Sequence, residues 1–169
     1  MESKRIISQN KIMLLLLLLL LNQVYNVEKN EITISINSTR NTRLNRIIDP
    51  NYEDKISQVV VNGYTSNITH FYDFLKEGIN QVTIKFNRYL DTCHNMFRSL
   101  SNVVSIDASN FYSSNVKDMS YMFGGCPSLK TLDLQGFDTS SVKDMSYMFA
   151  FSDSLKSLDL SSFNTSSES

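Results

Sequence analysis

Residues 116–123, with the sequence VKDMSYMF, open a block over residues 116–141 that is repeated at once. The blocks 116–141 and 142–167 are identical at 18 of 26 aligned positions without a gap, and a more diverged copy occupies residues 90–115. One unit of this size cannot bury its apolar face alone, so tandem copies are expected to stack against one another. The sequence therefore predicts a repeat domain over residues 90–169.

The first part of each unit has the spacing of a helix. Val116, Met119 and Met122 recur every three residues, as residues on one face of a helix do. Asn115 stands where an N-cap would, and Asp118, three residues later, fits the acidic position of a capping box. We therefore predict a short helix or helical turn at the start of each repeat.

The second part of each unit has the alternation of a strand. Residues 129–134 have the sequence LKTLDL, in which Leu132 and Leu134 would face inward. A helical turn and a strand in a unit of about 26 residues fit the length of leucine-rich repeats, and this segment contains their L-x-x-L-x-L core. The predicted fold class is an α/β solenoid of the leucine-rich-repeat kind, with short parallel strands joined by helical turns.

Stacking of such units places equivalent residues of successive repeats about 4.8 Å apart. Apolar residues at equivalent positions should then form continuous columns in the core. Three columns follow from the alignment: Ile106/Leu132/Leu158, Met96/Met122/Met148 and Phe111/Phe137/Phe163.

Polar side chains recur on the other face of the predicted strands, which makes that face the candidate binding surface. Its residues are Ser105, Asp107, Ser109, Thr131, Asp133, Gln135, Ser157, Asp159 and Ser161. The aspartates would be stacked about 5 Å apart, so they should hydrogen-bond neighbouring groups, meet a basic partner or hold a cation such as calcium. Calcium prefers six to eight oxygen ligands, and one Asp in each repeat does not obviously supply them. We predict no metal and no cofactor.

The N-terminus differs from the rest of the chain. Lys4, Arg5 and Lys11 precede an apolar run over residues 12–21, the layout of a signal peptide that would span residues 1–26. An uncleaved signal anchor is the alternative, because residues 22–26 lack the small residues of a cleavage site. No second apolar stretch follows, so we expect a secreted or cell-surface protein without a later membrane span.

Residues 27–89 are expected to form an N-terminal cap with degenerate repeats. Residues 32–36 alternate between apolar and polar side chains, and residues 59–61 are apolar and precede Asn62 and Gly63, so both segments are predicted strands. Three apolar residues before Gly78 predict a helical turn, and they are Phe71, Phe74 and Leu75.

No catalytic constellation is evident. His70 and His94 are the only histidines and lack the spacing of a zinc site, and neither a phosphate loop nor a nucleophile elbow is present. Cys93 aligns with the apolar Met119, which indicates a buried structural thiol. Cys126 lies too far from Cys93 in the predicted helical geometry for a bridge, so both are predicted to be unpaired. We predict no enzyme activity.

Two further features, a group of three arginines and three glycosylation sequons, say little about function. Arg40, Arg43 and Arg46 would form a basic stripe on a helix, but a solvated loop beside a sequon is the favoured interpretation. Because the rest of the chain is acidic, no nucleic-acid partner is predicted. Three sequons permit glycosylation without requiring it. Their acceptors are Asn37, Asn67 and Asn164.

The sequence of the repeat resembles that of the BspA-like family of leucine-rich-repeat surface proteins. The resemblance rests on VKDMSYMF, on SLKTLDL or SLKSLDL, and on FDTSS or FNTSS within residues 116–167; it is weaker over residues 90–115. Residues 78–86 look like the strand that precedes the repeats in protist members. The resemblance implies a surface or secreted protein that binds other macromolecules, often in adhesion.

We therefore expect a noncatalytic module that binds a protein, or a ligand of the cell surface or extracellular matrix. The alternative is a structural coat protein, or a truncated fragment of a longer array without a binding role. It rests on the end of the chain, where Ser169 follows a full repeat, so that an uncovered edge and self-association through it are expected.

Overall fold

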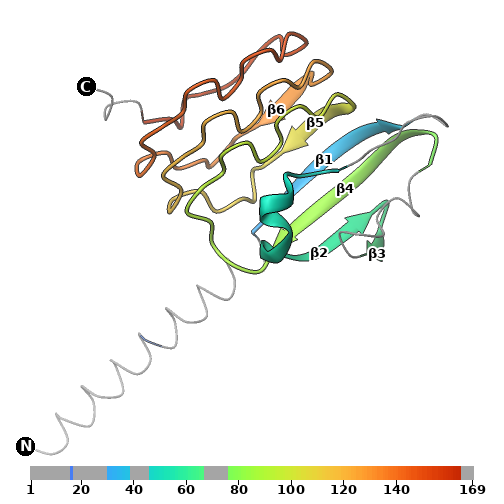
Figure 1. Cartoon of the computed structure of the whole chain (residues 1–169), viewed down its shortest axis with the longest axis horizontal. Helices are drawn as coiled ribbons and strands as arrows, with labels where there is room; N and C mark the ends of the chain where they lie inside the picture. Colours follow the sequence, from blue (N-terminus) through green and yellow to red (C-terminus); the bar gives the residue numbers. More distant parts are fainter. Residues whose placement is uncertain (1–15, 17–29, 39–45, 67–75, 165–169) are drawn as a thin grey trace, which may run out of the picture.

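A six-stranded sheet with the order β3-β2-β4-β1-β5-β6 forms the centre of the protein (Figure 1). The computed structural model describes Leu16 and residues 30–38, 46–66 and 76–164. The strands are β1 (Glu31–Ser38), β2 (Ile56–Val61), β3 (Tyr64–Ser66), β4 (Gly78–Phe86), β5 (Val103–Asp107) and β6 (Thr131–Asp133). A 3-10 helix, η1 (Pro50–Lys55), precedes β2.

The sheet is mixed, and this overturns the predicted fold class. β1 pairs antiparallel with both β4 and β5, and β2 pairs antiparallel with β3 and β4. β5 and β6 form the parallel pair. Within residues 30–38, 46–66 and 76–164 the single helix is η1, and the starts of the repeats are turns. The prediction of an α/β solenoid with helical turns is therefore wrong.

The backbone N–H groups of the repeats explain why no helix forms. Met119, Tyr121 and Phe123 donate to carbonyls of the third repeat at 2.8, 3.0 and 2.9 Å. A helix would keep these donors within its own segment. Tyr121 also has a φ of 55°, in the left-handed region that interrupts a right-handed helix. The three-residue spacing of buried side chains thus comes from successive turns.

The strands predicted before the repeats are confirmed. Residues 32–36 lie in β1 and residues 59–61 in β2, while the strand expected at residues 78–86 is β4. Asn62 and Gly63 join β2 to β3 with φ values of 51° and 87°. Both central residues of a type I′ hairpin turn need positive φ, which Asn and Gly accommodate best.

The third repeat does not form the predicted strand. Lys130 N–H donates to the Val104 carbonyl at 2.9 Å and helps to join the first two repeats. The structure describes all of residues 155–160, but no backbone hydrogen bond joins them to β6 and they form no strand. Among the described strands, parallel pairing is therefore limited to β5 and β6, and two isolated parallel bridges, Thr92–Asp118 and Asp118–Asp144, join the turns of successive repeats.

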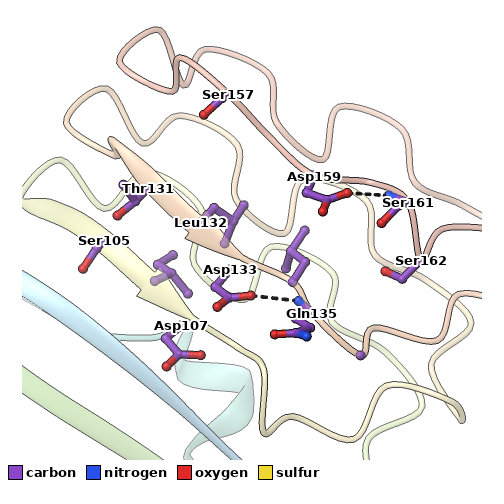
Figure 2. A pocket seen from close by; sticks show the side chains of 13 residues that line it. Ser105, Asp107, Thr131, Leu132, Asp133, Gln135, Ser157, Asp159, Ser161 and Ser162 are labelled. Atoms are coloured by element: carbon purple, nitrogen blue, oxygen red, sulfur yellow. Dashed lines mark hydrogen bonds between the residues drawn. The ribbon is translucent and has the colours of Figure 1, made fainter.

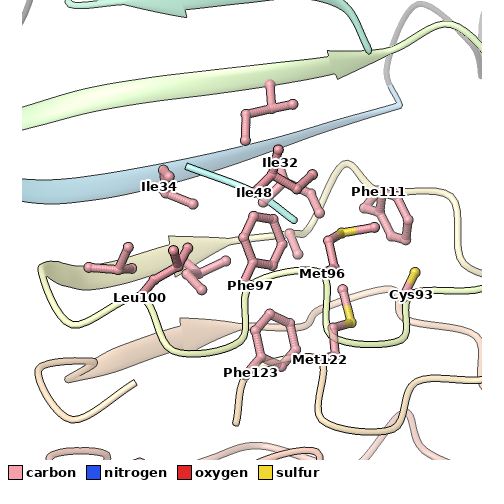
Figure 3. Close-up of a cluster of buried hydrophobic side chains, with 14 of the residues drawn as sticks. Ile32, Ile34, Ile48, Cys93, Met96, Phe97, Leu100, Phe111, Met122 and Phe123 are labelled. Carbon is pink, nitrogen blue, oxygen red and sulfur yellow. The ribbon is translucent and has the colours of Figure 1, made fainter. Parts of the chain in front are cut away.

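The predicted core columns are confirmed for the first two repeats and are partly open in the third. Met96, Met122 and Met148 are buried, whereas Leu158 and Phe163 are only partly buried. Aromatic rings stack from repeat to repeat, as in Phe97–Phe123, where the centroids are 5.9 Å apart and the planes differ by 5°. Figure 3 shows this stack beside the methionines.

Residues before the repeats share the same core. Ile32 and Ile34 of β1, together with Ile48, are buried in one cluster with Phe97 (Figure 3). Residues 46–52 also cover the first repeat by donating hydrogen bonds to its carbonyls. The bonds are Arg46 Nη2 to Arg98 O at 2.7 Å, Asp49 N to Met96 O at 2.8 Å, and Tyr52 Oη to His94 O at 2.9 Å.

Several predictions fall outside the part of the chain that the structure describes. They are the signal peptide over residues 1–26 apart from Leu16, the helical turn at Phe71, Phe74 and Leu75, and the roles of Arg40, Arg43, His70 and Asn67. The predicted division into residues 1–26, 27–89 and 90–169 stays a prediction. A membrane-spanning helix needs a long apolar run, and the described residues contain no such helix.

Replacing Gly125 by alanine should lower the free energy of unfolding by about 1–2 kcal/mol. Gly125 has a φ of 71°, and an added Cβ would lie 3.2 Å from Ser99 Oγ. Gly63 provides the control, since it has a φ of 87° but no heavy atom within 4 Å of an added Cβ. Urea unfolding should show a smaller loss for Gly63→Ala, and equal losses would contradict crowding between repeats.

Candidate functional site

An open groove of about 740 Å³ lies across β5, β6 and the strandless segment of the third repeat (Figure 2). Eight of the nine predicted binding-face residues line it. They are Ser105, Asp107, Thr131, Asp133, Gln135, Ser157, Asp159 and Ser161. Ser109 is the exception; it is half-buried and bonded to Asp107.

The strand register brings these side chains together. Ser105 is paired with Thr131, and Asp107 with Asp133, in the parallel β5–β6 ladder. Side chains two residues apart on a strand share a face, so serine or threonine and aspartate form adjacent rows. Asp159 continues the aspartate row from the third repeat without a strand (Figure 2).

Each aspartate of the groove holds the turn that follows it in the chain. Oδ1 of Asp133 accepts the Gln135 N–H at 2.9 Å, and Oδ1 of Asp159 accepts the Ser161 N–H at 2.9 Å. Oδ1 of Asp107 accepts both the Ser109 N–H at 3.0 Å and its hydroxyl at 2.6 Å. Such Asx turns are a structural use of aspartate. Of the three roles expected for the column, hydrogen bonding to neighbouring groups is the one observed.

The aspartates nevertheless keep capacity for a ligand. The backbone N–H and hydroxyl of Ser161 donate to Asp159 and hold the pKa of its carboxyl below the usual range. In the described part of the chain, the hydrogen bonds to Asp107 and Asp133 are accepted by Oδ1. A carboxylate oxygen can accept further hydrogen bonds. The described residues contain no group of three or more His, Cys, Asp or Glu that could hold a metal ion.

The polar face continues beyond the residues that the sequence identified. Thr33 of β1 is paired with Asp107 on one side and with Thr83 of β4 on the other. Oγ1 of Thr33 lies 2.8 Å from Oγ1 of Thr83. Directly paired residues share a sheet face, so this hydroxyl pair adjoins the aspartate row. Alternation in residues 32–36 was the available signal, but it did not reveal that β1 pairs with β5.

A histidine, a serine and an aspartate from two repeats also meet outside the groove. His94 Nδ1 lies 2.7 Å from Ser120 Oγ, and that hydroxyl donates to Asp118 Oδ1 at 2.5 Å. In a catalytic triad the histidine would lie between the serine and the acid and accept the serine proton. Here the serine lies between the other two and its proton goes to Asp118, so the order provides no activated nucleophile.

Both cysteines are free, as predicted, and Cys93 is buried, as predicted; Cys126 is buried as well. Burial raises the pKa of the Cys93 thiol well above its ordinary value, and burial also raises the pKa of Cys126. Thiols in such surroundings are poor nucleophiles. The Cys126 thiol donates instead to the Phe97 carbonyl at 3.1 Å and so links two repeats.

The glycosylation candidates that the structure describes are exposed. Asn37 lies near the end of β1, and Asn164 directly follows Phe163 of the third repeat. Their modification stays a prediction.

Comparison with known proteins identifies the repeats at a coarse level. Residues 91–169 match the model of a family described as "Mycoplasma protein of unknown function, DUF285". The match covers the second and third repeats and almost all of the first, which is slightly less than half of the chain. No curated protein and no solved structure matches the chain.

Proposed function

We propose that this chain is a noncatalytic binding module of a secreted or cell-surface protein, with the groove across β5 and β6 as its contact face. The observation that carries the proposal is the convergence of eight predicted residues on one open groove. In ligand-binding clefts, a few convergent polar groups fix the orientation of the ligand and provide specificity. The resemblance to the BspA-like family supports the extracellular location and a role in adhesion.

Charge narrows the kind of partner. Three of the thirteen residues that line the groove are aspartates, and none of the thirteen is Lys or Arg. An acidic groove favours partners that present amino or guanidinium groups, because complementary charges speed association and select the partner. The hydroxyl groups of Ser105, Thr131 and Ser157 would add hydrogen bonds of either direction. We expect a basic region of a protein on the cell surface or in the extracellular matrix.

Replacing Asp107, Asp133 and Asp159 together by asparagine should lower binding to plates coated with extracellular-matrix proteins about tenfold or more. Asparagine keeps the side-chain oxygen that holds each turn, so circular dichroism and the unfolding midpoint should stay close to those of the parent. The parent protein should lose binding as salt is raised, because exposed charges are screened.

The matched control removes three aspartates elsewhere. Asp138, Asp144 and Asp153 are exposed and lie outside the groove, and the first two also hold Asx turns, with Ser140 and Ser146. The triple asparagine variant at these positions has the same net charge as the groove variant. Equal loss of binding in both variants, or no loss in either, would exclude the groove as the contact face.

A further inference from the structure

The turn segments of successive repeats, residues 93–99, 119–125 and 145–151, are joined to one another by backbone hydrogen bonds that run in one direction. At alternate positions, an N–H group donates to the carbonyl that stands one position before its own equivalent in the next repeat. Eight bonds follow this rule: 93→118, 95→120, 97→122 and 99→124 between the first two repeats, and 119→144, 121→146, 123→148 and 125→150 between the last two. Each turn segment therefore presents donors on one edge and acceptors on the other.

The third repeat has the donor edge without an acceptor. By the same rule the free donors are the N–H groups of Met145, Tyr147, Phe149 and Phe151, and none of them bonds to an acceptor in the described part of the chain. The intervening N–H groups of residues 146, 148 and 150 are bonded within the repeat. Donors and satisfied groups thus alternate along this edge.

The aromatic stacks end at the same edge. Tyr147 stacks on Tyr121 at 4.8 Å between centroids, and Phe149 stacks on Phe123 at 6.0 Å. Tyr147 is 60% exposed, and Phe151 of the same turn segment is 75% exposed. Tyr121, by contrast, has a partner on both sides, because the Arg98 guanidinium lies 4.4 Å from the centre of its ring. Tyr147 and Phe149 cover the equivalent rings of the second repeat. Their own outer faces therefore offer a similar apolar surface to an incoming group.

The opposite end of the stack is closed. Residues 46–52 occupy the carbonyls of His94, Met96 and Arg98 in the first repeat. A second copy of this chain therefore cannot offer those acceptors to the donor edge. A matching surface must come from a repeat whose acceptor carbonyls are free.

We propose that the outer edge of the third repeat is a docking surface for a further repeat unit of the same sequence pattern. Alternate carbonyls of the incoming unit accept from residues 145, 147, 149 and 151, and its aromatic residues stack on Tyr147 and Phe149. The contact between the second and third repeats is the template, since the two units are identical at 18 of 26 aligned positions. The mode of recognition is strand-like addition at an unpaired edge.

A peptide with the sequence of residues 116–141 tests this proposal on the intact protein. Site-resolved amide hydrogen exchange should show at least tenfold slower exchange at residues 145, 147, 149 and 151 when the peptide is added. The N–H groups of residues 146, 148 and 150 should change little. Protection without this alternation would overturn the proposal.

Two variants address the aromatic contacts. Tyr147→Ala should weaken peptide binding at least fivefold, whereas Ile79→Ala should not, although Ile79 on β4 is also 60% exposed. A peptide carrying Tyr121→Ala and Phe123→Ala should bind more weakly than the parent peptide. Equal binding by all these forms would contradict docking through the rings.

A tandem protein with a second copy of residues 142–167 inserted after Ser167 removes the cost of associating a free peptide. The same four amides should become protected and the unfolding midpoint should rise. If neither the peptide nor the tandem copy protects them, the proposal is wrong. Sedimentation of the parent protein should show a monomer, and a dimer that Tyr147→Ala disrupts would identify a second copy as the occupant instead.

Discussion

Phe123→Ala should lower the free energy of unfolding by about 3–5 kcal/mol, the range observed for large aromatic side chains removed from well-packed cores. Phe123 is fully buried and lies between Phe97 and Phe149, with centroid distances of 5.9 and 6.0 Å and nearly parallel rings. The substitution leaves a cavity between three repeats at once. Urea denaturation monitored by circular dichroism gives the change directly.

Phe163→Ala is the matched control. Among the described residues Phe163 stacks on Phe137 alone, at 6.3 Å, and it is partly exposed. Its removal should therefore lower the free energy of unfolding by about 1–2 kcal/mol. A loss for Phe123→Ala no larger than that for Phe163→Ala would mean that the central stack does not hold the repeats together.

The repeat alignment predicted the core columns well because burial depends on position within the repeat. The error in fold class arose from a different property. A three-residue spacing such as Val116, Met119 and Met122 fits one face of a helix, but it fits a chain of turns equally well. The two differ in where the backbone N–H groups donate, and side-chain patterns do not record that. The donors of Met119 and Tyr121 go to the next repeat.

The missing third strand has a similar origin. Residues 155–160 have the sequence LKSLDL, which differs from the LKTLDL of residues 129–134 at one position, yet only the latter contain a strand. A strand is defined by hydrogen bonds to a neighbour. β6 has β5 beside it, whereas residues 155–160 form no such bonds with β6. Sequence identity between repeats therefore did not ensure identical structure.

The candidate site was predicted to the extent that it depended on local alternation. Asp107, Asp133 and Asp159 were placed on one face because the repeat aligns them, and they do line one groove. Thr33 and Thr83 were missed because their approach depends on β1 lying between β4 and β5. That order joins segments that are far apart in the chain, and no motif in either segment specifies the partner.

Asn30→Ala should lower the free energy of unfolding by about 2–4 kcal/mol, because it leaves two backbone groups without their partner. Asn30 is fully buried. Its side-chain Nδ2 donates to the Arg88 carbonyl at 2.9 Å, and its Oδ1 accepts the Tyr112 N–H at 3.0 Å. This one side chain therefore ties the segment before the first repeat to the end of that repeat.

Asn110→Ala separates this role from a general effect of losing an amide near the same turn. Asn110 is exposed and lies two residues before Tyr112, so its substitution should change stability by less than about 0.5 kcal/mol. In Asn30→Ala, amide exchange should accelerate most at Tyr112, whose donor has lost its acceptor. Because β1 starts at the next residue and pairs with both β4 and β5, the loss should spread to both sides of the sheet. A stable variant with unchanged exchange at Tyr112 would show that the Asn30 side chain does not hold the segment before the first repeat to the end of that repeat.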